Sequence, residues 1–367
     1  MTAASPALLP SPLFPGSTTA AYVLPELDVG SDFGALPLTL RGMETRCVYI
    51  SPAGDLFNLT GPMAGLEGVR IITQLTGDQS WPIEQVLTRS PYIMGARINR
   101  TNVGERHFQA GIMIGSHSPP LTEYQYRMAN NHWWASQDEN NDGWFGMYTR
   151  FSGWRWIPLR IFQTIKTPQR IDPTAFGNNA AAWDISWIAQ RPWFTKVALY
   201  DSFQASMVTT PTLAPAGSIS GTPEEAEYYW GTVVLANRGD LPSCAQFFIT
   251  SPGQAIVQDN DSQRLVVLPL TTTNVGTYMC DTAPGVRTLT AANDPSDNLL
   301  FDFIRQSTIL DFFLGGIANE GLPLAMQFQN RFIYQVPPQT VCSFTVGHSN
   351  PGGVITVLMP QMYKRGT

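Results

Sequence analysis

Short apolar runs rich in β-branched residues alternate with polar turns along the chain, most clearly in Trp230–Val257. Two runs in this stretch, Gly231–Ala236 and Gln246–Ile249, predict strands, and the polar turn Asn237–Asp240 follows the first of them. Pro242 disfavours a helix after that turn. The pattern continues in four further runs: Gln254–Val257, Arg264–Leu268, Val275–Asp281 and Val286–Thr290. Strands of about 5–7 residues are usual in β proteins, so the pattern predicts an antiparallel meander.

The same pattern predicts strands on both sides of this stretch. In the first half they are Cys47–Ile50, Val69–Leu75, Trp81–Leu87, Ile93–Ile98, His107–Ile114, Trp144–Thr149, Trp154–Phe162, Ala182–Ile188 and Trp193–Ser202. The polar stretch Asn102–Arg106 predicts a hairpin tip, and Phe151–Gly153 predicts a turn. The last predicted strands are Phe328–Val336, Val341–Val346 and Val354–Met359.

Two stretches have helical spacing instead. Thr122–Gln137 predicts a helix that Thr122 caps, although Asn130 and Asn131 weaken its middle. Asp297–Leu314 has apolar residues at amphipathic spacing and ends at Gly315-Gly316, which predicts a second helix.

The order of these elements predicts an all-β protein with minor helix and two β domains, residues 41–205 and 223–367. The Pro-, Gly-, Ser- and Thr-rich stretch 206–222 is the expected linker. Residues 1–40 contain six prolines and predict an extended arm. Because Leu13 and Phe14 would be costly to leave in water, we expect the arm to lie along a neighbouring subunit rather than to be disordered.

Composition supports the all-β class and adds an expectation about surfaces. The 367 residues include 29 Pro, 31 Gly and 11% aromatic residues, and only 14% are charged. Soluble domains usually have about 25% charged residues. Much of the surface is therefore expected to be neutral and polar, or to be covered by other subunits.

Net charge and cysteine spacing exclude several classes of function. The net charge of −6 argues against direct nucleic-acid readout, which needs a basic face. Cys47, Cys244, Cys280 and Cys342 are widely spaced, which predicts buried free thiols rather than a zinc or redox site, while a disulfide in the second half stays open. No apolar run is long enough to span a membrane. The N-terminus resembles neither a signal nor a transit peptide, so we expect the protein to stay, or to assemble, in the cytoplasm of the cell that makes it.

Candidate catalytic chemistry is sparse, and we expect no catalytic residues, no cofactor and no metal. Asp138–Gly143 resembles half of a calcium loop but has no bidentate Glu, so a solvated turn is favoured. Glu224, Glu225 and Glu227 lie beside aromatic residues, which leaves a glycosidase pair open. Simple sugar binding by exposed Trp or Tyr is the more plausible of these alternatives. Arg155 and Arg160 lie among large apolar residues, but the negative net charge favours a strand with one packed face.

The stretch WGTVVLANRGDLPSCAQFFITSPG, the later TYMCDTAPGVRTL and the terminal VPPQTVCSFTVGHSNPGGVITVLMPQMYKR resemble the C-terminal galectin-like domain of phage distal tail proteins. The signature of this resemblance is the turn Asn237, Gly239, Asp240 and Pro242. The first half, with RCVYISPAGDLFNLTG and GWRWIPLRIFQ, looks like the tail-ring half of the same proteins. The likeness is greatest to minor tail proteins of siphophages that infect mycobacteria and related actinobacteria.

The resemblance implies two β-sandwich domains: a ring-forming domain at 41–205 and a galectin-like domain at 223–367. It further implies a homo-hexamer at the tail tip of the virion, between the major tail tube protein and the tail-associated hub protein, holding other tail-tip proteins. Large aromatic and apolar side chains are the candidates for the subunit contact, although some can equally belong to the core: Leu13, Phe14, Trp144, Trp154, Trp156, Trp183, Trp187 and Trp193.

Three hypotheses follow. The first is a non-enzymatic structural protein of the phage tail tip or baseplate. The second is a carbohydrate-binding module that contacts host-envelope glycans. The third is a hydrolase that uses the carboxylates near Glu225 and Glu227.

Overall fold

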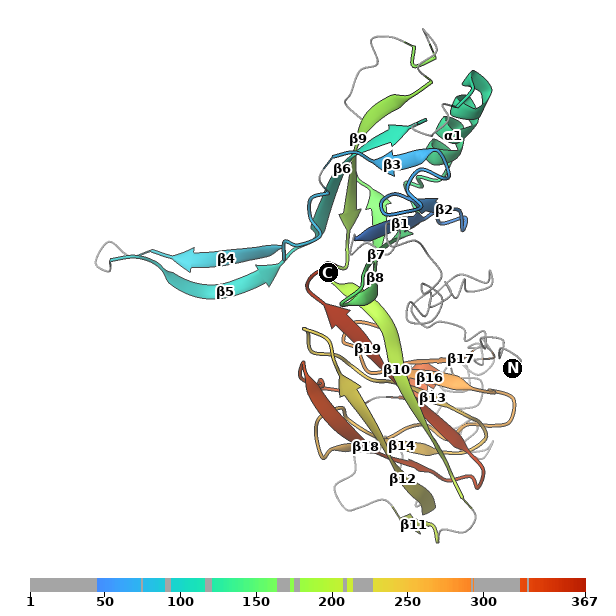
Figure 1. Ribbon diagram of the computed structural model, residues 1–367. Coiled ribbons are helices and arrows are strands. Elements are labelled where there is room, and N and C mark those ends of the chain that lie inside the picture. Colours follow the sequence, from blue (N-terminus) through green and yellow to red (C-terminus); the bar gives the residue numbers. More distant parts are fainter. Residues whose placement is uncertain are drawn as a thin grey trace, which may run out of the picture. The chain divides into compact units, whose positions relative to one another are not determined.

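The computed structural model describes residues 45–73, 75–89, 94–115, 121–163, 172–174, 179–206, 210–213, 227–291, 293, 324–328 and 330–367. It divides into two compact units (Figure 1). The first comprises residues 1–78 and 106–190 with Thr367, and the second comprises residues 79–105 and 191–366. The predicted linker 206–222 falls inside the second unit, and only its residues 206 and 210–213 are described.

Within the described residues the first unit is one antiparallel sheet of order β2-β1-β7-β8-β9-β6-β3. Its strands are β1 Arg46–Ile50, β2 Leu56–Asn58, β3 Val69–Ile71, β6 Arg106–Ile114, β7 Gly143–Thr149, β8 Gly153–Ile161 and β9 Ala181–Ala189. The Ile71 N–H donates to the Leu59 carbonyl at 2.9 Å, which brings the two ends of the sheet together. The enclosed core includes Phe57, Phe108 and Trp187.

Helix α1, Glu123–Ala135, is the predicted helix of the first unit. Thr122 caps it as predicted, because its hydroxyl accepts the Gln125 N–H at 3.3 Å while the Gln125 side chain accepts the Thr122 N–H at 3.0 Å. The helix buries Trp133, whose ring meets Tyr49 and Phe57 edge-on at centroid distances of 5.7 and 5.0 Å.

The second unit is a sandwich of two antiparallel sheets, with orders β17-β16-β13-β19-β10 and β11-β12-β18-β14-β15. The strands of the first sheet are β10 Phe194–Gln204, β13 Gln246–Ile249, β16 Tyr278–Asp281, β17 Leu289–Ala291 and β19 Val354–Tyr363. Those of the second are β11 Thr212–Leu213, β12 Glu227–Asn237, β14 Ala255–Gln258, β15 Leu265–Val267 and β18 Thr340–His348. The unit also includes the short helix α4, Leu324–Gln327, and the separate pair β4 Ile83–Thr88 and β5 Arg97–Val103.

Alternation along the strands builds the core of the sandwich. Every second residue of β19 is buried, as expected for a strand with one face inward. Phe247 of one sheet meets Phe344 of the other edge-on at 6.0 Å. All four cysteines are buried free thiols: Cys47 in the first unit, and the other three in the second. The strands and their packing confirm the all-β class.

Three predictions about connectivity are wrong. The strands around Asn237 do not form a meander, because β12 and β13 belong to different sheets. Asn102–Arg106 is not a hairpin tip, since β5 pairs with β4 while β6 pairs with β3 and β9. Phe328–Val336 is not a strand: Val336 makes one isolated bridge, to Ser243, and other contacts hold the segment. The predicted arm 1–40 and the predicted helix Asp297–Leu314 lie outside the described residues.

Candidate assembly surfaces

Strands β4 and β5 form a two-stranded antiparallel ribbon (Figure 1). The register of the two strands gives it two faces that differ in polarity. Ile83 pairs with Val103 and, beyond a bulge, Leu87 pairs with Ile98. Because side chains alternate along each strand, these four aliphatic residues share one face, with the polar pair Gln85 and Thr101 between them. This face is here called the apolar face of the ribbon. The opposite face is polar except for Val86 and carries Glu84, Val86, Arg97 and Arg100.

The apolar face of the ribbon is open to solvent in the single chain. Ile83, Leu87, Ile98 and Val103 are 54%, 43%, 53% and 49% exposed. Among the described residues no third strand pairs with β4 or β5. An isolated two-stranded hairpin is marginally stable in water, and open strand edges beside apolar side chains favour pairing with another chain. The ribbon therefore has the features of an assembly element.

The base of the ribbon is held by contacts inside the second unit. The Gly104 N–H donates to the Pro82 carbonyl at 3.1 Å, which closes the two strands at that end. The Lys364 ammonium lies 6.0 Å from the centroid of the Trp81 ring, at the limit of a cation–π contact.

Three predicted interface residues lie on the hairpin of β7 and β8. Trp154 and Trp156 are two positions apart on β8 and share a face, and their rings stack at 5.2 Å with 19° between their planes. Trp144 lies on the same face of β7 by register. A Cβ atom at Gly146 would lie 2.4 Å from the Trp156 ring, so glycine lets this indole lie across β7. All three tryptophans are partly buried.

The other candidates are divided between core, surface and undescribed segments. Trp187 is fully buried, and its indole N–H donates to the Gln137 side chain at 3.0 Å. Trp183 and Trp193 are partly buried. Leu13 and Phe14 lie outside the described residues.

The signature turn is a structural joint. Asn237 is fully buried, and its Nδ2 donates to the carbonyls of Leu241, Val336 and Pro337 at 2.9, 3.1 and 3.1 Å. Its Oδ1 accepts the Gly239 N–H at 3.0 Å. A side chain at Gly239 would begin 2.4 Å from the Met362 carbonyl oxygen, so only glycine fits there.

The rest of the turn extends this joint to the C-terminal strand. The Asp240 N–H donates to the Met362 carbonyl at 2.8 Å, and the Asp240 carboxylate accepts the Lys364 N–H at 3.2 Å. Pro242 is exposed at the end of the turn. Asn237, Gly239 and Asp240 therefore tie β12 to β19 and to the segment before β18.

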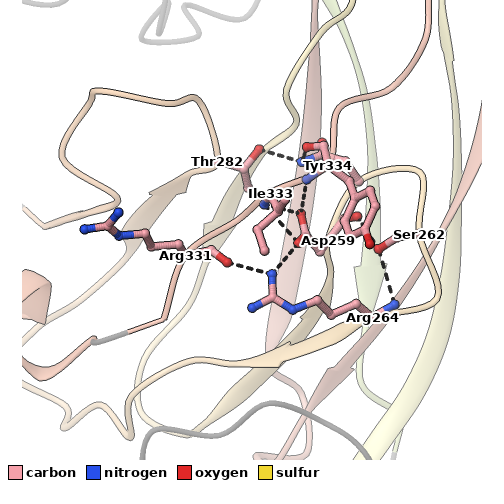
Figure 2. A network of polar contacts seen from close by, with 8 residues as sticks. Asp259, Ser262, Arg264, Thr282, Arg331, Ile333 and Tyr334 are labelled. Carbon is pink, nitrogen blue, oxygen red and sulfur yellow. Dashed lines mark hydrogen bonds and ion pairs between the residues drawn. The ribbon is translucent and has the colours of Figure 1, made fainter.

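A second polar cluster, called the clamp, consists of Asp259, Asn260 and Arg264. Figure 2 labels Asp259 and Arg264 with several of their partners. Asp259 is fully buried, and its carboxylate pairs with Arg264 Nη1 at 2.7 Å. The same carboxylate accepts the N–H groups of Ile333 at 3.1 Å and Tyr334 at 3.3 Å. These partners compensate for the desolvation of the buried carboxylate.

Asn260 completes the clamp. It is fully buried at φ 46°, a left-handed conformation that asparagine tolerates. Its Nδ2 donates to the Thr282 hydroxyl and to the Tyr334 carbonyl, both at 3.0 Å, and its Oδ1 accepts the Ala245 N–H at 2.8 Å. Arg264 also donates to the Arg331 carbonyl at 2.7 Å.

The clamp and Asn237 together fix the backbone of 331–337 without a sheet ladder. Phe332 packs against the core and stacks on Phe328 at 5.9 Å. The next two side chains, Ile333 and Tyr334, are 69% and 48% exposed. The clamp thus holds the backbone that carries two large side chains at the surface.

The candidates for catalysis and metal binding do not come together. Asp138 accepts the N–H groups of Asn140 and Asn141 at 2.7 and 3.2 Å, and its pKa is lowered chiefly by a hydrogen bond from the Asn141 side chain. Asp142 pairs with Arg160 at 2.8 Å. Among the described residues, no group of three or more His, Cys, Asp or Glu is arranged to hold a metal ion. Glu227 is exposed at the start of β12, while Glu224 and Glu225 lie outside the described residues.

Burial governs the chemistry of the thiols. It raises the pKa of Cys47 and of Cys342 to about 11, and it raises the pKa values of Cys244 and Cys280 as well. These groups are therefore protonated at neutral pH and are poor nucleophiles.

No described helix is long and apolar enough to cross a membrane.

Sequence reasoning missed the ribbon and the clamp. It predicted strands near β4 and β5 but neither their pairing nor their exposure, and all six residues of β4 are exposed. It gave no role to Asp259 and Asn260, because a polar loop usually faces water.

No family model matches the chain, and a search of curated proteins found no match. Among solved structures, the chain is similar to the Dit protein of phage SPP1, described as a paradigm of the hub adsorption apparatus in phages that infect Gram-positive bacteria. The TM-score is 0.48 at 10% identity, over 87% of this chain and 99% of that one. It is also similar to a chain of the phage P2 baseplate in its activated conformation with Ca, with a TM-score of 0.46 at 9% identity, over 88% of this chain and 100% of that one.

Proposed function

We propose that the protein is a structural component of the tail tip of a long-tailed phage, with no enzymatic activity. In this proposal six copies form a ring that joins the tail tube to the hub and baseplate proteins. The residue pattern around Asn237–Pro242, which resembles that of distal tail proteins, supports the family, and the low content of charged residues, 14%, suits large permanent interfaces.

The single observation that carries the ring is the uncovered apolar face of the ribbon. Four aliphatic side chains that are 43–54% exposed lie on one face of the hairpin, on either side of the polar pair Gln85 and Thr101, and no described strand pairs with its outer edges. Burying this face against a second copy removes apolar surface from water and stabilises the hairpin. A contact between unlike surfaces of identical subunits gives a closed ring when the rotation from one subunit to the next closes, and the proposed ring is of this kind.

The mass of the purified full-length protein tests the ring. Six copies of the 40.4 kDa chain come to about 242 kDa, which mass photometry or light scattering distinguishes from one copy. Leu87→Lys places a charge on the apolar face of the ribbon and is expected to yield single copies. Val86→Lys is the matched control, because this neighbour points to the opposite face and is 36% exposed against 43% for Leu87.

Two results contradict the proposal: a wild-type protein that stays a single copy at tens of micromolar, or a Leu87→Lys variant that assembles as the wild type does. Electron microscopy of purified virions after labelling with an antibody against the chain tests its position, which we expect to be the tail tip.

Carbohydrate binding by the second unit is the alternative function, favoured by two exposed aromatic side chains, Tyr200 at 61% and Tyr334 at 48%. Titration of the protein with host-envelope glycans, followed by aromatic fluorescence, separates the two hypotheses. A saturable response that disappears in Tyr334→Ala or Tyr200→Ala supports binding, whereas a purely architectural ring gives no saturable response.

A further inference from the structure

The face of the first unit's sheet that carries Trp154 and Trp156 is apolar. By register, β1, β7 and β8 place nine residues on this face in three rows. Only one of the nine, Arg46, is charged. The nine residues are here called the platform: Arg46, Tyr148 and Trp154 in the first row, Val48, Gly146 and Trp156 in the second, and Ile50, Trp144 and Pro158 in the third.

The platform lies on the face of these strands that is opposite the core. On the core face, the Trp133 ring of α1 meets Tyr49 and Phe57. On the platform, Val48 is 5% exposed, while the three tryptophans are partly exposed. The solvated face of an antiparallel sheet is normally polar, so we expect a further segment of chain to cover the platform.

The chain enters the platform at one corner. Arg46 is the first residue of β1, and its guanidinium lies 5.8 Å from the centroid of the Tyr148 ring, within the range of a cation–π contact. The Thr60 hydroxyl donates to the Thr45 carbonyl at 2.9 Å and accepts the Cys47 N–H at 2.7 Å. Residue 45 is therefore held beside the platform, and the 44 residues before it are tethered there.

Residues 36–40, with the sequence Leu-Pro-Leu-Thr-Leu, have the pattern of an extended segment that is apolar on one side. Pro37 disfavours the helical conformation at Leu36. Because side chains alternate along an extended chain, Leu36, Leu38 and Leu40 share one side, opposite Pro37 and Thr39. Leucine side chains are costly to leave in water. This side of the segment therefore needs an apolar surface to pack on.

We infer that residues 36–40 lie across the platform of their own chain, with the three leucines on the aromatic rings. Aromatic surfaces commonly bind extended segments that contain proline. The segment lies five to nine residues before Thr45, a stretch that spans up to about 16–30 Å when extended. Trp154 lies two strands from β1, which is about 10 Å. The segment therefore reaches the stacked tryptophans.

The tether selects the segment of the same chain over one from another copy. A short linker gives an effective concentration of about millimolar, well above that of a second copy in dilute solution. The inference concerns a single copy and does not depend on the proposed ring. It leaves the earlier part of the arm, with Leu13 and Phe14, for a neighbouring subunit.

Hydroxyl-radical footprinting of the full-length protein, read by mass spectrometry, tests the contact. It measures the oxidation rates of Trp154 and Trp156, with the fully buried Trp187 as the reference for folding. Leu38→Asp places a charge on the apolar side of the segment and is expected to speed the oxidation of Trp154 and Trp156 several-fold. Thr39→Asp is the matched control, because the same charge then lies on the opposite side and the rates should equal those of the wild type. Equal rates in all three proteins overturn the contact.

Photo-cross-linking identifies the segment that covers the platform. p-Benzoylphenylalanine replaces Leu38 or, as the control, Thr39 in the full chain. Position 38 is expected to cross-link to peptides from 144–158 several-fold more than position 39. A link within one chain leaves the denatured protein at 40.4 kDa, whereas a link between copies doubles this mass. Links to 144–158 that occur only in the product of doubled mass assign the platform to another copy and overturn the inference, as does the lack of any link to 144–158.

Discussion

Replacing Asn237 by alanine tests whether the signature turn is a structural joint. The side chain is fully buried and serves four backbone groups, at 2.9–3.1 Å. The Val336 carbonyl keeps its bond from the Ser243 N–H at 3.0 Å, so alanine leaves three groups without this partner. At roughly 1 kcal/mol for each lost bond, with about 1 kcal/mol for the cavity, Asn237→Ala should lower the free energy of unfolding by about 3–4 kcal/mol.

Differential scanning calorimetry measures this loss in the transition of the second unit. For a domain of its size, about 1 kcal/mol corresponds to about 2–4 °C in Tm, so the expected decrease is about 6–16 °C. The same variant should speed hydrogen exchange in peptides that cover 331–339, because Asn237 holds the Val336 and Pro337 carbonyls.

Two further variants sharpen the test. Arg238→Ala removes an exposed side chain from the same turn and should change the free energy of unfolding by less than about 0.5 kcal/mol. Asn237→Asp keeps the size but turns carboxylate oxygens toward backbone carbonyls, so it should destabilise at least as much as alanine. If Asn237→Ala lowers Tm no more than Arg238→Ala does, the hydrogen bonds of the joint do not stabilise the unit and the reasoning is refuted.

Asp259→Asn removes the charged partner of Arg264 and should lower the free energy of unfolding of the second unit by about 3 kcal/mol, seen as a lower Tm; an unchanged Tm would show that the buried pair is not stabilising. Burial raises the pKa of Cys47 from 9.0 to about 11, so its contribution to stability is complete below pH 9 and is lost as pH rises toward 11. Urea unfolding in the presence of reductant should show that the free energy of unfolding of the first unit falls by about 2 kcal/mol between pH 8 and pH 10.5 because of this thiol. Cys47→Ser should reduce that pH dependence. Gly146→Ala places a Cβ 2.4 Å from the Trp156 ring and should destabilise the first unit by about 1–3 kcal/mol; calorimetry that shows no change would mean that the indole moves freely.

Local pattern was enough to predict many of the elements. The alternating apolar residues of 354–359 belong to β19, and the predicted strand Gln246–Ile249 coincides with β13. Thr122 caps α1 as predicted, because a capping box needs only residues three positions apart. These strands and this helix cap depend on residues close together in the sequence, so a single sequence is enough to predict them.

The pairing of strands and the burial of polar side chains depend on residues far apart in the sequence, so local pattern did not predict them. Asn237 bonds a carbonyl 99 positions away, and Asp259 bonds the amide of Ile333, 74 positions away. Phe328–Val336 has an apolar pattern typical of a strand, but these buried side chains bind its backbone in place of a neighbouring strand. The connection 102–106 has the polar residues of a hairpin tip, yet β5 pairs with the preceding strand β4, while β6 pairs with β3 and β9.

Segment 331–337 and the outer edges of the ribbon both have backbone N–H and C=O groups that no neighbouring strand binds, but the two differ in what surrounds these groups. Segment 331–337 has no ladder, but fully buried Asp259, Asn260 and Asn237 bind its N–H and C=O groups, so its order is built into the second unit. No buried polar side chain binds the outer edges of the ribbon within the described residues, and its apolar face is open to solvent. Since a lone hairpin is marginal in water, we expect a partner chain on the apolar face to stabilise the ribbon beyond the contacts that hold its base inside the second unit. The surface around Ile333 and Tyr334, in contrast, is fixed by contacts within the second unit.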